Sequence, residues 1–528
     1  MRRAALLALL ALGLLACAHL AASLPSQSAV LKRKRGKKRA AAEQRQLAER
    51  DWVAASVQRY LSNQELGDWL AGFEKRCKAV AKLSTIGTSA EGRPIWALEI
   101  SDRPGQAEAE PAVKYVGNVH GDEPTGRVFT LALAEWLCAN HKTDPRAKRI
   151  VQSMHLWLVP TMNPDGFERR SRGNSQGQDL NRDFPDRFSS PAMQPSGQEQ
   201  PEVAAMMAWS QSVGFVASAS MHEGALVANY PWDGTADRST RYENCPDDAT
   251  FRHLASLYAT THKRMAQPDN PEFPNGGTTN GAAWYPIYGS MQDWNYIVGR
   301  CFELTLELSQ NKWPDEPGLA ALWEDNKDSL LAFPLAAAYG GLWGTVREEG
   351  SLRGSKGREV APLGGANITV LATATGEEQP AWVLSREGRG DYYRPLAPGR
   401  YTVVVSKAGY KPFAANFTVP ADGSGAQRHF VLAREGSNWG GEVAHAPRFL
   451  AGGAPEDASA AAAGGGGSLL PWKAAIGLNG SGEAGQLWTA EQTRSRDRLV
   501  MLGAGAVCVY GLWITHSRLK RRSHPRRM

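Results

Sequence analysis

The 528-residue chain has few cysteines, six in all, and no two of them are spaced as Cys-x-x-Cys. Cysteine pairs at that spacing build the common zinc knuckles, so this kind of metal site is excluded. The chain also contains no long-period internal repeat, which excludes a repeat architecture. It is too long for one small core, and roughly 150 residues per domain predicts about three domains.

Basic charge is scarce in the body of the chain. The formal net charge is +7, but fifteen lysines and arginines are concentrated in Arg2-Arg3, residues 32–39 and residues 518–527. Removing these fifteen from +7 leaves −8 for the remainder. Nucleic-acid binding needs a basic surface, so we expect no nucleic-acid partner. A mildly acidic body suits a cationic substrate better.

Long hydrophobic runs are also rare, and the first of them lies at the N-terminus. Residues 4–15 are apolar, follow Arg2-Arg3 and precede small residues up to Ser23. This order is typical of a secretory signal peptide, which we expect over residues 1–23, rather than of a membrane helix. Residues 24–50 are basic and polar and predict a leader or possible propeptide, with a solvated charge run as the simpler alternative.

The second hydrophobic run, residues 499–515, holds seventeen residues without a charge. This length is near the lower limit of roughly 17–25 residues for a membrane span. The basic residues that follow would place the tail in the cytosol. We therefore expect a single transmembrane helix over residues 498–516 and a basic cytosolic tail over residues 517–528, although a buried core helix could show the same run. The bulk of the chain would then lie in the lumen of the secretory pathway or outside the cell.

Such a compartment is oxidising, which bears on the remaining cysteines. The cysteines outside the two apolar runs are Cys77, Cys138, Cys245 and Cys301. Four cysteines allow three pairings, and the sequence leaves the choice open. Acceptor triplets for N-linked glycosylation begin at Asn367, Asn416 and Asn479.

Apolar periodicity divides the rest of the chain. Residues 51–341 mix helical spacing with short apolar strands, which predicts one α/β domain with a mixed central sheet flanked by helices. Residues 342–433 predict a small antiparallel β-sandwich. Residues 434–497 are rich in Gly, Ala and Ser and predict a linker. The expected helices are residues 62–80, 129–139 and 201–213, and the expected strands are residues 95–100, 113–116, 155–159, 215–221, 301–308, 360–371 and 400–405.

Two histidines and a glutamate follow predicted strands of the α/β domain. His120 and Glu123 come after the strand at residues 113–116, and His222 comes directly after the strand at residues 215–221. The ends of neighbouring strands converge at one edge of a sheet. Two imidazoles and a carboxylate can hold a catalytic zinc ion and leave one position for water. The alternatives are a solvated His-x-x-Glu pair and a histidine satisfied by hydrogen bonds.

Further charged residues suit the binding of a carboxylate and the transfer of a proton. The polar segment 172–186 carries Arg172 and Arg182, and an arginine can bind a carboxylate through two parallel hydrogen bonds. A solvated surface loop is the alternative. Glu303 and Glu307 interrupt an apolar strand, where a carboxylate is costly unless it is paired or functional.

These residues lie in segments that resemble the zinc metallocarboxypeptidases of the regulatory (carboxypeptidase N/E-like) subfamily. The resemblance covers residues 60–432 and implies a metallocarboxypeptidase fold followed by a transthyretin-like β-sandwich. Segments that carry it are residues 118–127, 163–168, 179–186, 218–233, 280–285, 291–296 and 301–308, with residues 390–401 in the β-sandwich.

The resemblance also implies roles for particular residues. One zinc ion would be bound by His120, Glu123 and His222. Glu307 would act as general base and then as proton donor, and Arg172 would stabilise the oxyanion. Asn181, Arg182 and Tyr285 would hold the terminal carboxylate of the substrate, and Asp233 and Gln292 would recognise a basic side chain. The implied activity is hydrolysis of the C-terminal peptide bond of peptides and proteins, with a preference for C-terminal Lys or Arg, in peptide processing.

Three residues depart from the subfamily's pattern. Glu223 and Ser290 stand where glycine is usual, and Asp183 stands where asparagine is usual. None of these changes removes a catalytic group, but Glu223 would add negative charge beside the metal. One alternative is a catalytically silent, membrane-anchored binding protein of the same fold. Another is a zinc-dependent hydrolase of small N-acyl amino acids. The catalytic and carboxylate-binding residues named above are all present, which favours the carboxypeptidase.

Overall fold

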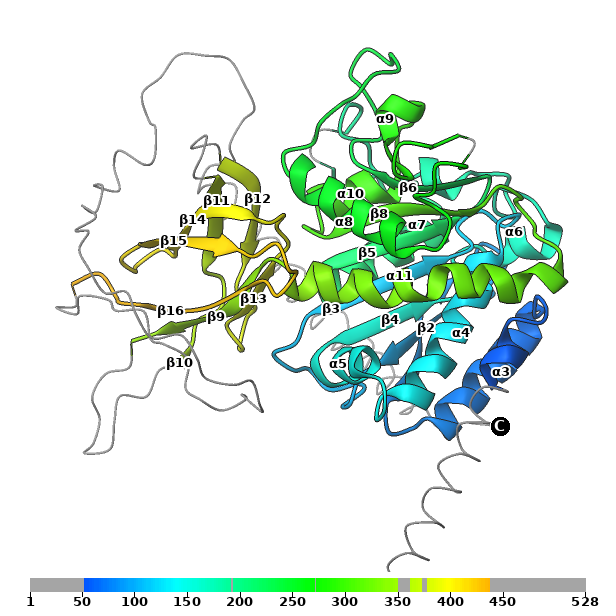
Figure 1. Ribbon diagram of the computed structural model, residues 1–528, viewed down its shortest axis with the longest axis horizontal. Coiled ribbons are helices and arrows are strands. Elements are labelled where there is room, and N and C mark those ends of the chain that lie inside the picture. Colours follow the sequence, from blue (N-terminus) through cyan, green and yellow to red (C-terminus); the bar gives the residue numbers. More distant parts are fainter. Residues whose placement is uncertain (1–51, 191–192, 271, 350–360, 373–377, 437–528) are drawn as a thin grey trace, which may run out of the picture. The chain divides into compact units, whose positions relative to one another are not determined.

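The computed structural model describes residues 52–190, 193–270, 272–349, 361–372 and 378–436 (Figure 1). The expected signal peptide, basic leader, membrane span and cytosolic tail lie outside these residues, as does all but the start of the expected linker. Within the described part, no helix combines the length and the apolar character that crossing a bilayer requires.

An eight-stranded mixed sheet forms the centre of the α/β part. Its strands are β1 (Ala81–Thr88), β2 (Pro94–Ile100), β3 (Ala112–Gly117), β4 (His155–Val159), β5 (Ala217–His222), β6 (Ala225–Tyr230), β7 (Thr278–Asn280) and β8 (Phe302–Ser309). In space the order is β1-β2-β4-β3-β5-β8-β6-β7. Strands β4, β3, β5 and β8 run parallel, whereas the pairs β1–β2, β2–β4 and β6–β8 are antiparallel. The predicted mixed sheet is confirmed.

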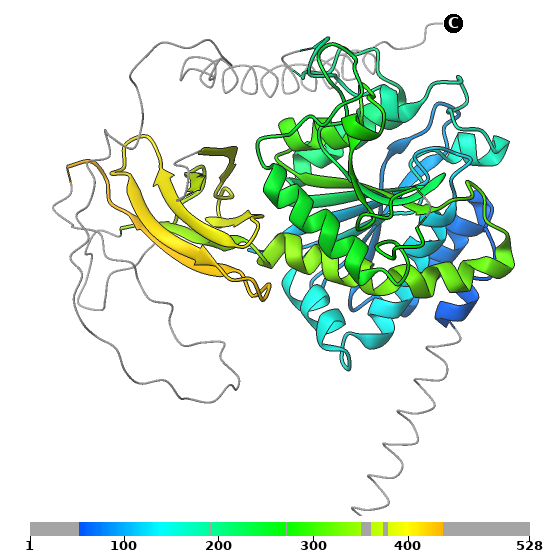
Figure 2. The same cartoon turned by 45° about the horizontal axis from the view of Figure 1, so that its top comes forward.

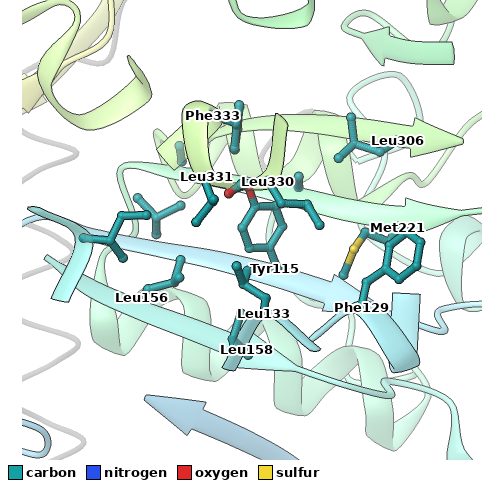
Figure 3. Close-up of a cluster of buried hydrophobic side chains, with 14 of the residues drawn as sticks. Tyr115, Phe129, Leu133, Leu156, Leu158, Met221, Leu306, Leu330, Leu331 and Phe333 are labelled. Carbon is teal, nitrogen blue, oxygen red and sulfur yellow. Dashed lines mark hydrogen bonds between the residues drawn. The ribbon is translucent and has the colours of Figure 1, made fainter. Parts of the chain in front are cut away.

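Helices cover both faces of this sheet (Figure 1, Figure 2). They are α3 (Asn63–Arg76), α4 (Thr125–Asn140), α5 (Pro145–Ser153), α6 (Pro164–Arg169), α7 (Pro201–Val213), α8 (Asp248–Thr261), α9 (Gly281–Trp284), α10 (Met291–Ile297) and α11 (Leu319–Tyr339). One face of the sheet forms the larger apolar core with helices α3, α4, α5, α8 and α11. The other face packs against residues of α7 and α10. Figure 3 shows the larger core, in which the hydroxyl of Tyr115 donates to the carbonyl oxygen of Leu330 on α11 at 2.8 Å.

The two-residue period of the strands sorts their side chains between these faces. On β8, Phe302, Leu304 and Leu306 enter the larger core, so Glu303 and Glu307 point to the opposite face. Strand β5 follows the same rule: Ala217, Ala219 and Met221 enter the core, while the other face carries Ser218, Ser220 and His222. The carboxylates that interrupt the apolar pattern of β8 therefore share a face with His222.

Residues 342–432 form a second, all-β part with an apolar core of its own. Its strands are β9 (Leu342–Glu348), β10 (Ala361–Pro362), β11 (Asn367–Ala372), β12 (Glu378–Leu384), β13 (Asp391–Arg394), β14 (Gly399–Ser406), β15 (Phe413–Val419) and β16 (Ala426–Leu432). They make two four-stranded sheets, as expected for a small sandwich. The strand pairs are antiparallel as expected, except that β16 runs parallel to β9. The preceding strand β15 belongs to the other sheet, so the chain crosses between the sheets before β16 pairs with β9.

Of the three possible disulfide pairings, the structure contains a bond between Cys77 and Cys138. It joins the end of α3 to α4. Within the described chain, Cys245 and Cys301 are buried free thiols.

Candidate functional site

The predicted metal ligands meet at the C-terminal ends of the parallel strands. His120 and Glu123 lie in the loop between β3 and α4, and His222 is the last residue of β5. Glu307, near the end of β8, is the cross-strand partner of His222. Crevices at this edge of an open α/β sheet are the usual position for ligand binding.

The β3–α4 loop is held in one conformation by its own residues. Asn118 has a φ of 52°, and its side-chain amide donates to the carbonyl oxygens of His120, Gly121 and Glu123 at 2.7, 3.2 and 3.2 Å. Gly121 packs against the backbone of Gly166, since a Cβ at this position would lie 2.0 Å from the Gly166 carbonyl carbon. These contacts stabilise the loop conformation in which His120 and Glu123 face His222.

His120, Glu123 and His222 are buried, and one ligand atom from each lies within 4.8 Å of the others. Oε2 of Glu123 is 2.7 Å from Nδ1 of His120 and 2.9 Å from Nδ1 of His222. The two Nδ1 atoms are 3.1 Å apart. Ring nitrogens this close to each other and to a carboxylate form a donor set that fits a zinc ion with one coordination position left open.

Two residues that sequence reasoning did not assign surround this set. Oδ1 of Asp179 lies 3.1 Å from Nε2 of His120, and Oδ2 accepts from Nε of Arg172 at 2.9 Å. With a metal bound at Nδ1, the nitrogen that faces Glu123 and His222, Nε2 of His120 would carry the proton and donate it to Asp179. Lys312 donates to Oε1 of Glu123 at 2.8 Å. Asp179 stands in the polar segment noted in the sequence, whereas no sequence pattern marked Lys312.

The carboxylates of the site have perturbed pKa values. Although burial opposes ionisation, His120 and His222 lower the pKa of Glu123 well below its ordinary value. Burial, together with the charge of Glu123, raises the pKa of Glu307 to about 8. Oε2 of Glu307 is buried and has no hydrogen-bond partner among the described residues. A glutamate in this state can accept and return a proton near neutral pH.

A cavity of about 160 Å³ opens beside these residues. Tyr285 stands at its mouth with 46% of its surface exposed. Oδ1 of Asn181 accepts from the backbone N–H of Met291 at 2.9 Å, which fixes the side chain of Asn181. The predicted residues that line the cavity are His120, Glu123, Arg172, Asn181, Arg182, His222, Asp233, Tyr285 and Glu307.

Gln292 is the one predicted site residue that does not line this cavity. Its side-chain amide donates to Oδ1 of Asp233 at 3.0 Å, and its Oε1 accepts from the backbone N–H of Thr305 at 2.7 Å. Asn229 donates to the same Asp233 oxygen at 3.3 Å. Gln292 is 1% exposed, so it lies behind Asp233 and orients it.

Asp233 presents one oxygen for which the structure provides no partner. Its Oδ2 is buried and makes no hydrogen bond to any described residue. Burial raises the pKa of Asp233. An incoming cation would favour the ionised form and satisfy this oxygen.

The three departures from the subfamily's pattern have local structural roles. The carboxyl of Glu223 accepts from the backbone N–H of Thr125 at 3.0 Å, and burial raises its pKa well above its ordinary value. The extra negative charge expected at this position is therefore disfavoured. Ser290 caps α10 by accepting from the N–H of Asp293 at 3.3 Å. Asp183 accepts from the N–H of Gln200 at 2.6 Å.

Comparison with known proteins agrees with this geometry. The family model described as zinc carboxypeptidase matches residues 66–329, half of the chain, and the model described as carboxypeptidase regulatory-like domain matches residues 349–433. Carboxypeptidase SOL1 of Arabidopsis thaliana is 45% identical over 385 residues, which cover 73% of this chain and 74% of the relative. The catalytic chain of carboxypeptidase N from Rattus norvegicus is 38% identical over 381 residues, 65% of this chain and 79% of the relative.

Carboxypeptidase D of Homo sapiens is 38% identical over 386 residues, 70% of this chain. These residues make up only 26% of that protein, so this chain corresponds to about a quarter of its length. The matched families, the relatives and the metal-binding geometry at the sheet edge agree. The chain belongs to the zinc carboxypeptidase family.

Proposed function

We propose that this enzyme removes C-terminal Lys or Arg from peptides and proteins. The observation that carries the proposal is one cavity that combines a His-Glu-His set with two carboxyl oxygens, Oε2 of Glu307 and Oδ2 of Asp233, that have no hydrogen-bond partner among the described residues. The first two groups suit hydrolysis of a peptide bond, and the third suits recognition of a positive charge.

His120, Glu123 and His222 would hold one zinc ion. Lewis-acid polarisation of the scissile carbonyl is the chemistry that zinc supplies at such a site. The fixed β3–α4 loop and the contact between Asp179 and His120 keep the ligand atoms oriented.

Glu307 would take a proton from the attacking water and pass it to the leaving amine. Burial raises its pKa to about 8 in the metal-free site, and the charge of a bound zinc ion would lower that pKa, so both its protonated and its ionised form would be accessible near neutral pH. Arg172 would neutralise the negative charge that develops on the carbonyl oxygen. Interactions formed mainly in the transition state raise kcat.

Asn181, Arg182 and Tyr285 would bind the free carboxylate of the last substrate residue. An internal peptide bond has no carboxylate to place there, so these donors would remain unpaired. The enzyme would therefore act only at chain ends.

Asp233 would pair with the ammonium or guanidinium group of the last residue. Gln292 would act as a positioning residue, because it contacts Asp233 and does not line the cavity. Both oxygens of the Asp233 carboxyl would then be satisfied, one by Gln292 and Asn229 and the other by substrate.

A panel of peptides that differ only in the last residue tests this function. Peptides ending in Lys or Arg should be cleaved fastest, amidated versions should be resistant, and a zinc chelator should stop the reaction. Equal cleavage of amidated and free ends would refute the exopeptidase assignment. Absence of turnover on the whole panel by zinc-loaded enzyme would favour a silent binding protein.

We further infer that the chain enters the secretory pathway and is anchored by residues 498–516, with the catalytic domain lumenal or extracellular. The Cys77–Cys138 disulfide supports an oxidising compartment. Deletion of residues 496–528 should release active enzyme into the medium. Continued retention of the truncated protein on membranes would refute the anchor.

A further inference from the structure

A second cluster of potential metal ligands lies away from the candidate active site. Glu108, Glu110 and His155 each offer one ligand atom, and these atoms lie within 4.8 Å of one another. Both glutamates belong to the segment between β2 and β3, and His155 is the first residue of β4. His155 pairs with Ala112 at the start of the parallel strand β3, whereas the active site follows the other end of β3. The two clusters therefore lie at opposite ends of strand β3.

The imidazole ring of His155 is oriented and protonated in a way that suits metal binding at Nε2. It is 7% exposed, and its Nδ1 lies 2.7 Å from Oε1 of Glu99. Because a carboxylate only accepts, Nδ1 carries the proton and Nε2 presents a lone pair. Nε2 is buried and has no hydrogen-bond partner in the described part of the chain. A histidine whose second nitrogen donates to a carboxylate is the usual arrangement of a metal ligand.

The two glutamates each present an unsatisfied oxygen as well. Oε2 of Glu108 and Oε2 of Glu110 are buried without a hydrogen bond to any described group. Arg103 pairs with the other oxygen of Glu108 at 3.0 Å, so it leaves Oε2 open. Two carboxylates and an imidazole lone pair repel one another in a partly buried setting, and a cation bound between them would relieve this repulsion.

The segment that carries the glutamates is also held by the all-β part. The hydroxyl of Tyr393 donates to the carbonyl oxygen of Ala109 at 2.9 Å. Arg386 donates to the carbonyl oxygen of Glu110. The Glu99 side chain adds a further restraint, since the backbone N–H of Gly105 donates to its carboxylate oxygen Oε2 at 2.6 Å. The backbone on both sides of Glu108 is therefore held by hydrogen bonds, at Gly105 and at residues 109–110.

We propose that Glu108, Glu110 and His155 form a second divalent-cation site, separate from the catalytic one. An imidazole ligand selects a transition metal of the zinc class, whereas calcium takes oxygen ligands only. A bound cation ties the β2–β3 segment to β4, next to the contacts with Tyr393 and Arg386. This site does not depend on the proposed substrate preference.

Metal content of the full-length protein tests the proposal. Protein stripped with a chelator, reloaded with zinc chloride and freed of excess metal should carry about two zinc ions per chain. His155→Gln and the double variant Glu108→Gln/Glu110→Gln should each carry about one. Asp102→Asn, which removes an exposed carboxylate from the same segment, should keep both. Hydrolysis by all of these proteins should equal that of the wild type, because the lost ion is not the catalytic one.

Several results would overturn this site. Wild-type protein with a single zinc ion, or variants that retain two, would show that these residues do not bind zinc. Calcium that competes with zinc equally well in the wild type would remove His155 from the ligand set. The double variant alters half-buried side chains at the surface, so it remains a valid test if the His155 variant does not fold.

Discussion

His222 and Glu307 are paired positions of the parallel strands β5 and β8. Both side chains point to the sheet face opposite the larger core, because each strand alternates with a period of two residues. The register of one strand pair therefore places the proposed general base beside a proposed metal ligand. A shift of one residue in either strand would turn that side chain into the apolar core.

Glu307→Gln should strongly reduce hydrolysis and leave zinc content unchanged. The substitution removes the proton acceptor but none of the His-Glu-His ligands, so we expect kcat to fall by roughly 10²–10⁴-fold. Steady-state kinetics together with metal analysis measure both effects. Glu303→Gln, on the same strand and the same face but outside the cavity, is the matched control and should retain turnover. Normal turnover by the Glu307 variant would contradict the mechanism.

Asp233→Asn should reduce the preference for C-terminal Arg over C-terminal Phe. Loss of a charge-assisted contact costs about 1.5–3 kcal/mol, so the ratio of the two kcat/KM values should fall by about 10- to 150-fold. Paired assays on two peptides that differ only in the last residue give this ratio. Asp293→Asn is the control, since Asp293 accepts from the backbone N–H of Asp233 and does not line the cavity. An unchanged ratio in the Asp233 variant would place specificity elsewhere.

Arg394→Met should strongly destabilise the protein. Arg394 on β13 forms a fully buried ion pair with Asp247, next to α8. Removing the cation leaves a buried carboxylate without its partner, which costs about 3–5 kcal/mol in the free energy of unfolding. Denaturant unfolding measures the change.

Two further variants control for this experiment. Lys263→Met, which breaks an exposed pair with Glu324 at 3.5 Å, should cost less than about 1 kcal/mol. Arg394→Met combined with Asp247→Asn should recover part of the lost stability, because no unpaired charge remains. If the single and double variants were equally unstable, the ion pair would not be the cause.

Ionisation of Glu303 should lower the free energy of unfolding as pH rises from about 4.5 to 7. Burial raises its pKa from 4.5 to about 7 in the folded protein, so its stabilising contribution is complete below pH 4.5 and is lost as pH passes 7. Each unit is worth about 1.4 kcal/mol, so the effect is roughly 3 kcal/mol. Unfolding curves across this pH range should show that Glu303→Gln, which keeps an acceptor for Asn295, removes this part of the slope. A variant with the wild-type pH dependence would contradict this assignment.

Strand and helix positions were predictable where local periodicity was strong. The strand predicted at residues 113–116 appears as β3 (Ala112–Gly117), and the helix predicted at residues 201–213 is α7. Helix α11 was not predicted, because its apolar residues are only weakly segregated to one side and it contains Pro334. Such a helix shows little contrast between its faces, and proline normally interrupts helical patterns.

The sequence predicted which residues form the candidate site better than it predicted how they are arranged. Nine of the ten predicted residues line one cavity, whereas Gln292 lies behind Asp233. Lys312 and Asp179 contact the metal-ligand set without any sequence signal for those contacts. Whether a polar side chain faces a cavity or supports its neighbour depends on rotamers and packing, which sequence spacing does not encode.

The sequence by itself determined the fold class, the absence of cysteine-based metal knuckles and the types of side chain available for catalysis. These follow from local properties: apolar period, residue chemistry and the position of polar residues after strands. Tertiary structure decided the Cys77–Cys138 pairing, the parallel arrival of β16 beside β9 and the second Glu-Glu-His cluster. Each of these joins segments distant in the chain, and only the packing of sheets and helices sets which distant groups come within a few ångströms.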